Sequence, residues 1–160
     1  MSYTPPAYNA VNFQGFGESY TPPAHDAVNF TRDDPVLLAP VSDVSAGAWV
    51  ASGGGSLYAA LDEDPADDGD YIYTETPSTG SVAMAAATDP ALSTGHVVRY
   101  RLRPGSGSVT VTLKQGSTTI AAWGPHVLGV NPQNFSQTLT GTQADSITDY
   151  SALRVEQTAS

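Results

Sequence analysis

Short runs of alternating apolar and polar residues, separated by turn residues, cover much of the chain from residue 36 onward. The clearest run is HVVRYRLR at residues 96–103. A period of two predicts a strand with one core-facing and one solvent-facing side. The inward positions are His96, Val98, Tyr100 and Leu102, and the outward positions are Val97, Arg99, Arg101 and Arg103.

The next run repeats this pattern and adds a turn. Residues 109–114 read VTVTLK, so their apolar members fall on one face of a second strand. Gln115-Gly116-Ser117 is typical of a hairpin turn that leads into residues 118–123. The expected core consists of Val98, Tyr100, Leu102, Val109, Val111, Leu113 and Ile120.

The remaining signals have the spacing of an antiparallel β-sandwich or jelly roll. Expected strands cover residues 48–51, 57–61, 71–74, 81–85, 96–103, 109–115, 118–123, 134–139 and 153–157. Only residues 143–147 indicate a helical turn, with Thr142 as its N-cap. Because 33 Ser and Thr, 15 Gly and 12 Pro occur beside a single lysine, the composition also favours β structure. We predict an all-β fold, a jelly-roll-like antiparallel β-sandwich over residues 35–160 with an extended N-terminal arm over residues 1–34.

The arm contains an internal repeat. Residues 3–13 read YTPPAYNAVNF and residues 20–30 read YTPPAHDAVNF, so nine of eleven positions are identical at a spacing of 17. The Pro-Pro pairs favour extended backbone. Each copy has too few apolar groups to form a core, and extended segments with spaced anchors commonly bind partner proteins.

We therefore interpret residues 1–34 as a docking arm; the alternative is a pair of strands or a loop that belongs to the main domain. The expected docking residues are Tyr3, Pro5, Pro6, Val11, Phe13, Tyr20, Pro22, Pro23, Val28 and Phe30. Two copies in one chain suggest two equivalent docking sites or one site contacted twice.

The order of several sequence blocks resembles a β-sandwich module of hypothetical and virion proteins from tailed bacteriophages and prophages. The blocks, which span about two-thirds of the chain, are Trp49, LYAALDE (57–63), DGDYIY (68–73), STGHVVRYRLR (93–103), VTVTLKQGSTTIAAW (109–123) and QADSITDYSALRV (143–155). The repeats of the arm are also similar to segments of phage structural proteins. The resemblance implies a virion component and carries no catalytic motif.

The chain is strongly acidic, with 16 acidic and 6 basic residues and a formal charge of −10. Such a surface repels phosphate backbones, so we expect no nucleic-acid partner. No run of about 18 apolar residues predicts a membrane span. With no cysteine, disulfides and thiolate metal sites are excluded.

Six carboxylates lie within residues 62–70. Clustered loop carboxylates supply the oxygen ligands that Ca²⁺ takes. The candidate ligands are Asp62, Asp64, Asp67, Asp68 and Asp70. Because their spacing does not follow the EF-hand loop, we favour a solvated loop with no metal or other cofactor. Some of its carboxylates are expected to pair with the arginines of residues 99–103.

The sequence predicts no enzyme. The histidines His25, His96 and His126 are far apart, and no Gly-x-Ser-x-Gly elbow accompanies them. Ser93, Thr94 and Gly95 precede His96, but a catalytic triad is defined by geometry rather than by composition. The paired carboxylates of a glycosidase carry no signal here because acidic residues are so numerous.

Exposed aromatic rings on a β-sandwich are a common way to bind sugars. The candidates are Trp49, Tyr58, Tyr71, Tyr73, Tyr100, Trp123 and Tyr150. Trp123 and Tyr100 lie in strongly patterned strands, where aromatic rings usually fill the core.

We expect a non-enzymatic structural protein of the phage virion. Its arm would anchor it to other virion proteins, such as capsid, portal, collar or tail subunits, and its sandwich would be displayed as a capsid decoration or a fibre or tail accessory. We also expect a homo-oligomer. The alternative is a carbohydrate-binding adhesion module for glycans of the host surface.

Overall fold

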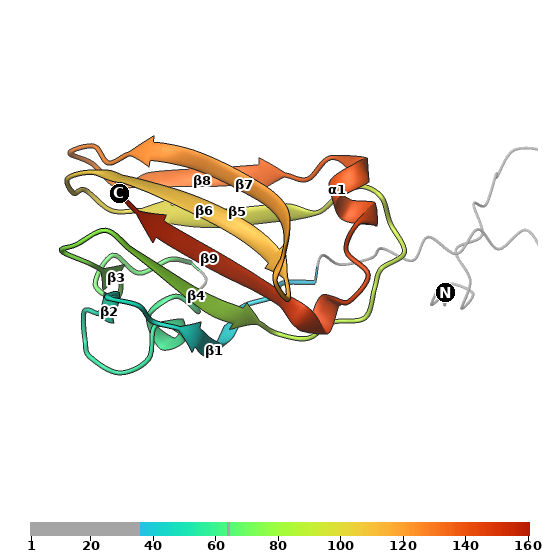
Figure 1. Ribbon diagram of the computed structural model, residues 1–160, viewed down its shortest axis with the longest axis horizontal. Coiled ribbons are helices and arrows are strands. Elements are labelled where there is room, and N and C mark those ends of the chain that lie inside the picture. Colours follow the sequence, from blue (N-terminus) through green and yellow to red (C-terminus); the bar gives the residue numbers. More distant parts are fainter. Residues whose placement is uncertain (1–35, 64) are drawn as a thin grey trace, which may run out of the picture. The chain divides into compact units, whose positions relative to one another are not determined.

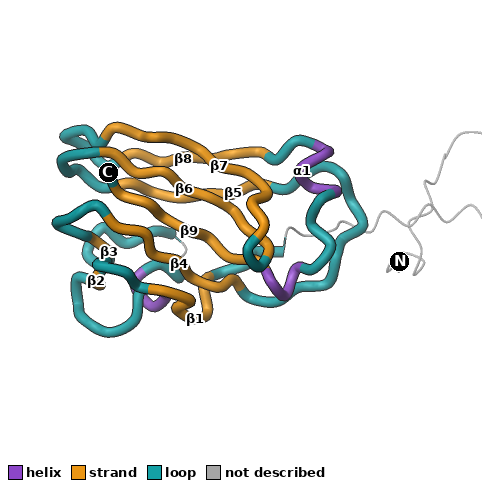
Figure 2. The backbone as a smooth tube through the Cα atoms, in the orientation of Figure 1, coloured by secondary structure: helices purple, strands orange, loops and turns teal. Residues whose placement is uncertain are grey.

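Antiparallel strands are the main secondary structure of the part of the chain that the computed structural model describes, residues 36–63 and 65–160 (Figure 1; Figure 2). Within that part, Leu37–Ser160 form one compact unit. The strands are β1 (Pro40–Ser45), β2 (Val50–Ala51), β3 (Ile72–Tyr73), β4 (Ser78–Met84), β5 (Val97–Leu102), β6 (Ser108–Gln115), β7 (Thr118–Val127), β8 (Gln133–Thr138) and β9 (Leu153–Ala159). The helical segments are α1 (Gly141–Asp145) and two 3₁₀ turns, Tyr58–Ala60 and Tyr150–Ala152.

The main sheet has five strands in the order β1-β4-β9-β6-β7. The C-terminal strand β9 lies between β4 and β6, so the centre of the sheet forms from segments distant in sequence. The register aligns Val82, Val155, Leu113 and Ala121 in one row across four strands. All four side chains belong to the hydrophobic core or pack against it, so this row defines the inner face of the sheet.

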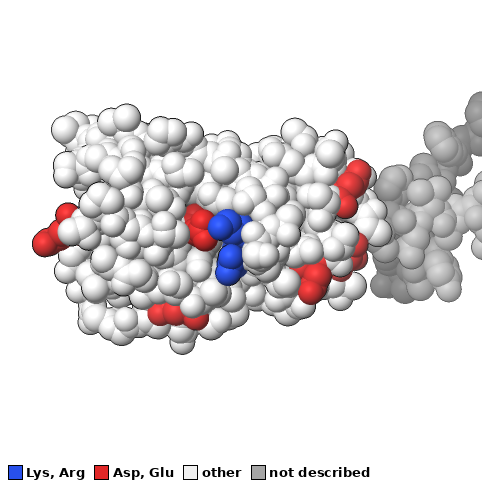
Figure 3. Space-filling model, viewed as in Figure 1, with Lys and Arg blue, Asp and Glu red and all other residues white. Residues whose placement is uncertain are grey.

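The outer face of the main sheet is polar and built of small residues. The neighbouring row aligns Ser81, Glu156, Thr112 and Ala122. Nζ of Lys114 lies 2.7 Å from Oε1 of Glu156, which pairs the two charges across β6 and β9. Figure 3 shows basic and acidic side chains together near the middle of an otherwise largely uncharged surface. Because this face is polar, it can stay exposed to water, and no further layer of helices or strands has to cover it.

The strands β5 and β8 form a separate two-stranded sheet that packs on the inner face of the main sheet. Val98 packs against the cluster that contains Leu113, whereas Tyr100 and Leu102 pack against the cluster that contains Val111. The inward and outward positions predicted for this strand are therefore confirmed. The third sheet, β2–β3, adds Ile72 to the same core.

The predicted core is confirmed as well. The four members from the main sheet are buried, and the three members from β5 are partly buried against them. The predicted hairpin joins β6 to β7, with Gln115 paired to Thr118. Gly116 in this turn has a φ of +56°, a conformation that L side chains rarely adopt.

The strand predicted over residues 57–61 is wrong. These residues contain the 3₁₀ turn Tyr58–Ala60. The carboxylate of Asp43 accepts hydrogen bonds from the backbone N–H groups of Leu57 and Tyr58, at 2.9 and 2.8 Å. These hydrogen bonds from a distant segment satisfy the backbone N–H groups at the start of the turn. They hold Leu57 in the core, where its exposure is 2%.

Two further differences lie at the ends of elements. The helix α1 is capped by Thr140 rather than by Thr142: the hydroxyl of Thr140 accepts a hydrogen bond from the backbone N–H of Gln143, and the side-chain oxygen of Gln143 accepts one from the N–H of Thr140. The strand β1 was not expected. It is a largely exposed edge strand with two irregularities in its register, so it lacks a clear period of two.

Candidate functional site

Three arginines project from the outward side of β5 and its end. Because Val98, Tyr100 and Leu102 pack inward, Arg99 and Arg101 must point away from the main sheet, and Arg103 follows directly after the strand. Half of the chain's 6 basic residues therefore lie on β5 or directly after its end.

Arg101 is held in a fixed position by two neighbours. Its Nε and Nη2 atoms donate to the two carboxylate oxygens of Asp68, both at 2.7 Å, and its Nη1 donates to Oδ1 of Asn134 at 2.8 Å. The hydrogen bond from Arg101 lowers the pKa of Asp68, and the same bond raises the pKa of Arg101. The predicted pairing of the acidic stretch with the arginines is confirmed for this pair.

Arg103 stacks on an aromatic ring. Its Cζ atom lies 3.8 Å from the centroid of the Tyr71 ring, within the range of a cation–π contact. Tyr73 is 43% exposed, and its ring centroid is 6.0 Å from that of Tyr71. Since Ile72 between them packs into the core, both tyrosines occupy the outward side of β3 or its start.

These contacts join the outward sides of β3, β5 and β8 into one continuous surface. We call this surface the arginine–tyrosine strip; its members are Asp68, Tyr71, Tyr73, Arg99, Arg101, Arg103 and Asn134. Sequence reasoning identified the arginines and tyrosines separately. It missed Asn134 and the contact between Arg103 and Tyr71, because a period of two shows which residues point outward but not which strands are neighbours.

In the described residues, the carboxylates of residues 62–70 do not gather around a common point. Oδ1 of Asp67 accepts from the backbone N–H of Gly69 at 2.7 Å, and Oδ1 of Asp70 accepts from the hydroxyl of Ser52 at 3.4 Å. Asp64 lies outside the described residues. Across residues 36–63 and 65–160, no group of three or more His, Asp or Glu side chains is arranged to hold a metal ion.

Two histidine–tyrosine pairs lie between the layers. Nε2 of His96 is 2.6 Å from the hydroxyl of Tyr150, and Nε2 of His126 is 2.7 Å from the hydroxyl of Tyr100. Burial raises the pKa of both tyrosines, and the charges of nearby aspartates add to this at Tyr150. The ring of Phe135 stacks on Tyr100 with centroids 5.1 Å apart. No serine hydroxyl is hydrogen-bonded to a histidine in the described part of the chain, so these pairs do not assemble a triad there. Sequence reasoning did not find them.

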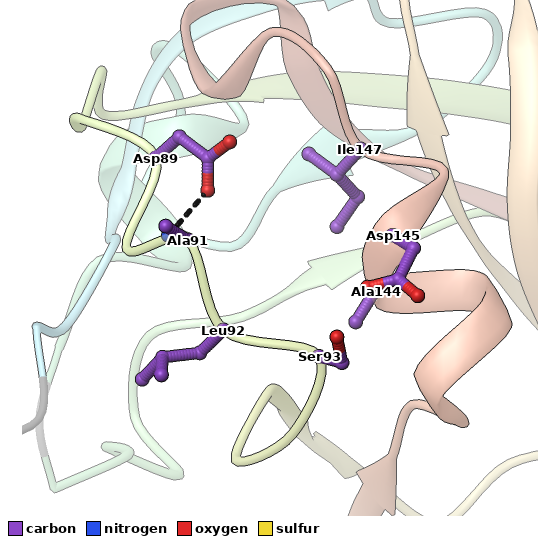
Figure 4. A pocket seen from close by; sticks show the side chains of 7 residues that line it. All are labelled: Asp89, Ala91, Leu92, Ser93, Ala144, Asp145 and Ile147. Atoms are coloured by element: carbon purple, nitrogen blue, oxygen red, sulfur yellow. Dashed lines mark hydrogen bonds between the residues drawn. The ribbon is translucent and has the colours of Figure 1, made fainter.

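A small polar pocket lies beside α1 (Figure 4). It is lined by Asp89, Ala91, Leu92, Ser93, Ala144, Asp145 and Ile147. Oδ1 of Asp89 is occupied by the backbone N–H of Ala91 at 2.7 Å, as the dashed line in the figure shows. Asp145 projects from the helix on another side of the pocket. The lining holds two carboxylates, Asp89 and Asp145, and no histidine, lysine or arginine.

Most of the aromatic residues considered for sugar binding are parts of the core. Trp49 and Tyr150 are buried, and Tyr58, Tyr100 and Trp123 pack against the core clusters. Among those candidates in the described residues, Tyr73 alone is classed as exposed, and Tyr71 is partly covered by Arg103. The expected docking residues of the arm lie outside the described residues, as do His25 and Arg32.

No protein-family model, no curated protein and no solved structure matches the chain. In the part of the chain that the structure describes, no helix is both long and apolar enough to cross a membrane.

Proposed function

We propose that this protein is a non-enzymatic structural component of a tailed-phage particle. In this proposal residues 1–34 anchor the chain to other virion proteins, such as capsid, portal, collar or tail subunits. The β-rich body is displayed as a capsid decoration or as a fibre or tail accessory. The observation that carries the proposal is the repeat of residues 3–13 and 20–30, which conserves the anchors and prolines within one chain.

The repeat supports anchoring because each copy presents the same apolar groups at the same spacing. Two similar docking segments on one chain bind an assembly far more tightly than one segment, since the second contact forms at high effective concentration. The compact unit of residues 37–160 has its own core, which supports a body that folds without the arm.

For the finer fold we propose an antiparallel β-sandwich. The support is the packing of the β5–β8 and β2–β3 sheets on the inner face of the main sheet, with apolar side chains from all three in shared clusters. A sandwich with exposed polar faces suits display on a particle. We also propose that the protein assembles as a homo-oligomer, which sedimentation analysis of the purified chain would test.

Deletion of residues 1–34 tests the function directly. We expect the truncated protein to remain folded with nearly the parent melting temperature and to be lost from purified particles. As a length-matched control, the four rings Tyr3, Phe13, Tyr20 and Phe30 are replaced by serine in the full chain; this variant should also fail to incorporate. Normal incorporation of a stable truncated protein would refute the anchoring role. An unstable truncated protein would place the repeats in the domain itself.

A second candidate function is carbohydrate binding, and the strip is the observation that favours it. Tyr73 exposes an aromatic ring 6.0 Å from the ring of Tyr71, which is in contact with Arg103. Copy number separates the two candidates: a decoration protein occurs in many symmetry-related copies per particle, whereas an adhesin is scarce and is retained on host polysaccharide.

A further inference from the structure

The arginine–tyrosine strip combines the two kinds of group that sugars need. A sugar ring has an apolar C–H face, which stacks on an aromatic ring, and a polar edge, which needs planar hydrogen-bonding groups. Tyr73 supplies an exposed ring at one end of the strip. Arg101, Asp68 and Asn134 form a rigid hydrogen-bonded group farther along it.

Arg103 is the member of the strip best placed to bind an anion. The contact of its Cζ with the Tyr71 ring is not a hydrogen bond, so it does not consume the N–H donors of the guanidinium. In the described residues, Arg103 has no hydrogen bond and no ion pair within 4.0 Å. Arg101, in contrast, commits three nitrogen atoms to Asp68 and Asn134. A carboxylate on the ligand is therefore expected to form a bidentate contact with Arg103.

The charge of the strip and of its surroundings determines which kind of acidic ligand can bind. Three guanidinium groups and the single carboxylate of Asp68 leave the strip positive, although the whole chain has a charge of −10. The overall charge and the other carboxylates of residues 62–70 repel a densely charged polymer. The favoured ligand thus carries isolated negative charges that are separated by uncharged units.

We propose that the arginine–tyrosine strip binds a polysaccharide in which carboxylate-bearing sugars alternate with uncharged sugars. Arg103 holds the carboxylate, and Tyr73 stacks on the neighbouring uncharged ring. This site deepens the carbohydrate-binding candidate and rests on it, whereas it is independent of the structural role of the arm.

The test titrates the full-length protein with hyaluronan oligosaccharides, in which uronate and uncharged sugars alternate, at physiological ionic strength in a calorimeter. The matched ligand is the same oligosaccharide after reduction of its carboxyl groups. We expect the acidic form to bind about tenfold more tightly, which corresponds to about 1.4 kcal/mol. Heparin, which is densely sulfated, should bind no more tightly than hyaluronan.

Substitutions assign the effect to the strip. Arg103→Gln should weaken binding of the acidic form about tenfold and leave binding of the reduced form nearly unchanged. Tyr73→Ala should weaken both forms. Arg32→Gln makes the same charge change in the arm, and Leu92→Ala removes an exposed apolar side chain outside the strip. Both controls should bind like the parent.

Melting curves establish that each variant is folded, and Arg103→Lys provides a conservative second variant. Lysine keeps the charge but loses the flat stack and the bidentate fork, so its affinity should fall between those of the parent and Arg103→Gln. If Arg103→Gln and Arg103→Lys both bound the acidic oligosaccharide like the parent, the assigned site would be wrong.

Equal affinity of the parent for the acidic and reduced forms would refute the acidic ligand while leaving carbohydrate binding in place. No binding of either form at millimolar concentration would refute this site and the carbohydrate-binding candidate together. Neither result bears on the deletion of residues 1–34, which tests the structural function separately.

Discussion

Replacing Val111 with aspartate tests the core of the body most severely. Val111 lies in the middle of β6, is 4% exposed, and is paired across the sheet with Gln157 and Trp123. Its side chain belongs to the cluster that also contains Val82 and Val109. An aspartate at this position would place a carboxylate among apolar groups on the inner face.

The expected loss of stability follows from two terms. Val111→Ala removes two carbon atoms at about 0.8 kcal/mol each and leaves a small cavity, so it should cost about 2 kcal/mol. In a domain of this size that loss lowers the melting temperature by about 8 °C. Val111→Asp adds the burial of an unpaired charge, about several kcal/mol more. Because a domain is stable by only about 5–15 kcal/mol, this variant should be largely unfolded.

Thermal and urea unfolding, followed by circular dichroism, measure the difference. The matched control is Val130→Asp, because Val130 is 89% exposed and the chemical change is the same. Its stability should lie within about 0.5 kcal/mol of the parent. If Val111→Asp melted cooperatively at the temperature of Val130→Asp, the inner face of the main sheet would be wrongly assigned.

The pH dependence adds a second check on the same variant. Burial raises the pKa of an unpaired aspartate in the folded state above its unfolded value. The protonated form is then favoured by folding, so the deficit of Val111→Asp relative to Val111→Ala should shrink as the pH falls. A deficit that stayed constant down to the unfolded pKa would show that the carboxylate reaches water.

Three smaller predictions test local features. Thr140→Ala should cost about 1 kcal/mol of stability in urea unfolding, whereas Thr142→Ala should cost little, because Thr140 caps the helix. The stability difference between the parent and Asp68→Asn should be present at neutral pH and vanish as the pH falls through the lowered pKa of Asp68; a difference that persisted below it would not come from the pair with Arg101. Melting temperatures with a chelator and with millimolar Ca²⁺ should agree, since a site filled at about 100 times its dissociation constant would add about 2.7 kcal/mol.

The strands that sequence reasoning located correctly are those whose neighbours are close in the chain or whose pattern is regular. The period of two in β5 and β6 identifies the inward residues without knowledge of the partner strand. Gly116 marks the hairpin because few other residues adopt its conformation. Such features depend on local geometry, so the sequence alone is enough to predict them.

The errors occurred where a distant contact decides the local structure. Residues 57–61 were predicted to be a strand, but the backbone N–H groups of Leu57 and Tyr58 donate to Asp43, which lies on β1. The edge strand β1 is exposed on most of its length and so carries no apolar alternation. Neither feature follows from a short window of sequence, because the decisive partner is another segment of the chain.

The candidate site likewise has contacts that could be predicted from the sequence and contacts that could not. The pairing of Arg101 with an acidic residue was predictable from charge, since an arginine row beside an acidic stretch favours ion pairs. The stack of Arg103 on Tyr71 was not, because it depends on how the small β2–β3 sheet lies against β5. The histidine–tyrosine pairs were missed for the same reason: His126 and Tyr100 lie 26 residues apart on different strands.

The arginines of β5 are more informative about function than the residues of the core. An outward strand position needs only a polar side chain, and the outer face of the main sheet meets this need with Thr110, Thr112 and Thr158. Threonine at position 99 would serve the strand as well. A chain with 6 basic residues nevertheless has three of them in this row, one of them stacked on a tyrosine. Arg101 has a structural role through its pair with Asp68, whereas Arg103 serves the ligand in the proposal above, so substitutions of Arg103 should alter binding while the melting temperature stays close to that of the parent.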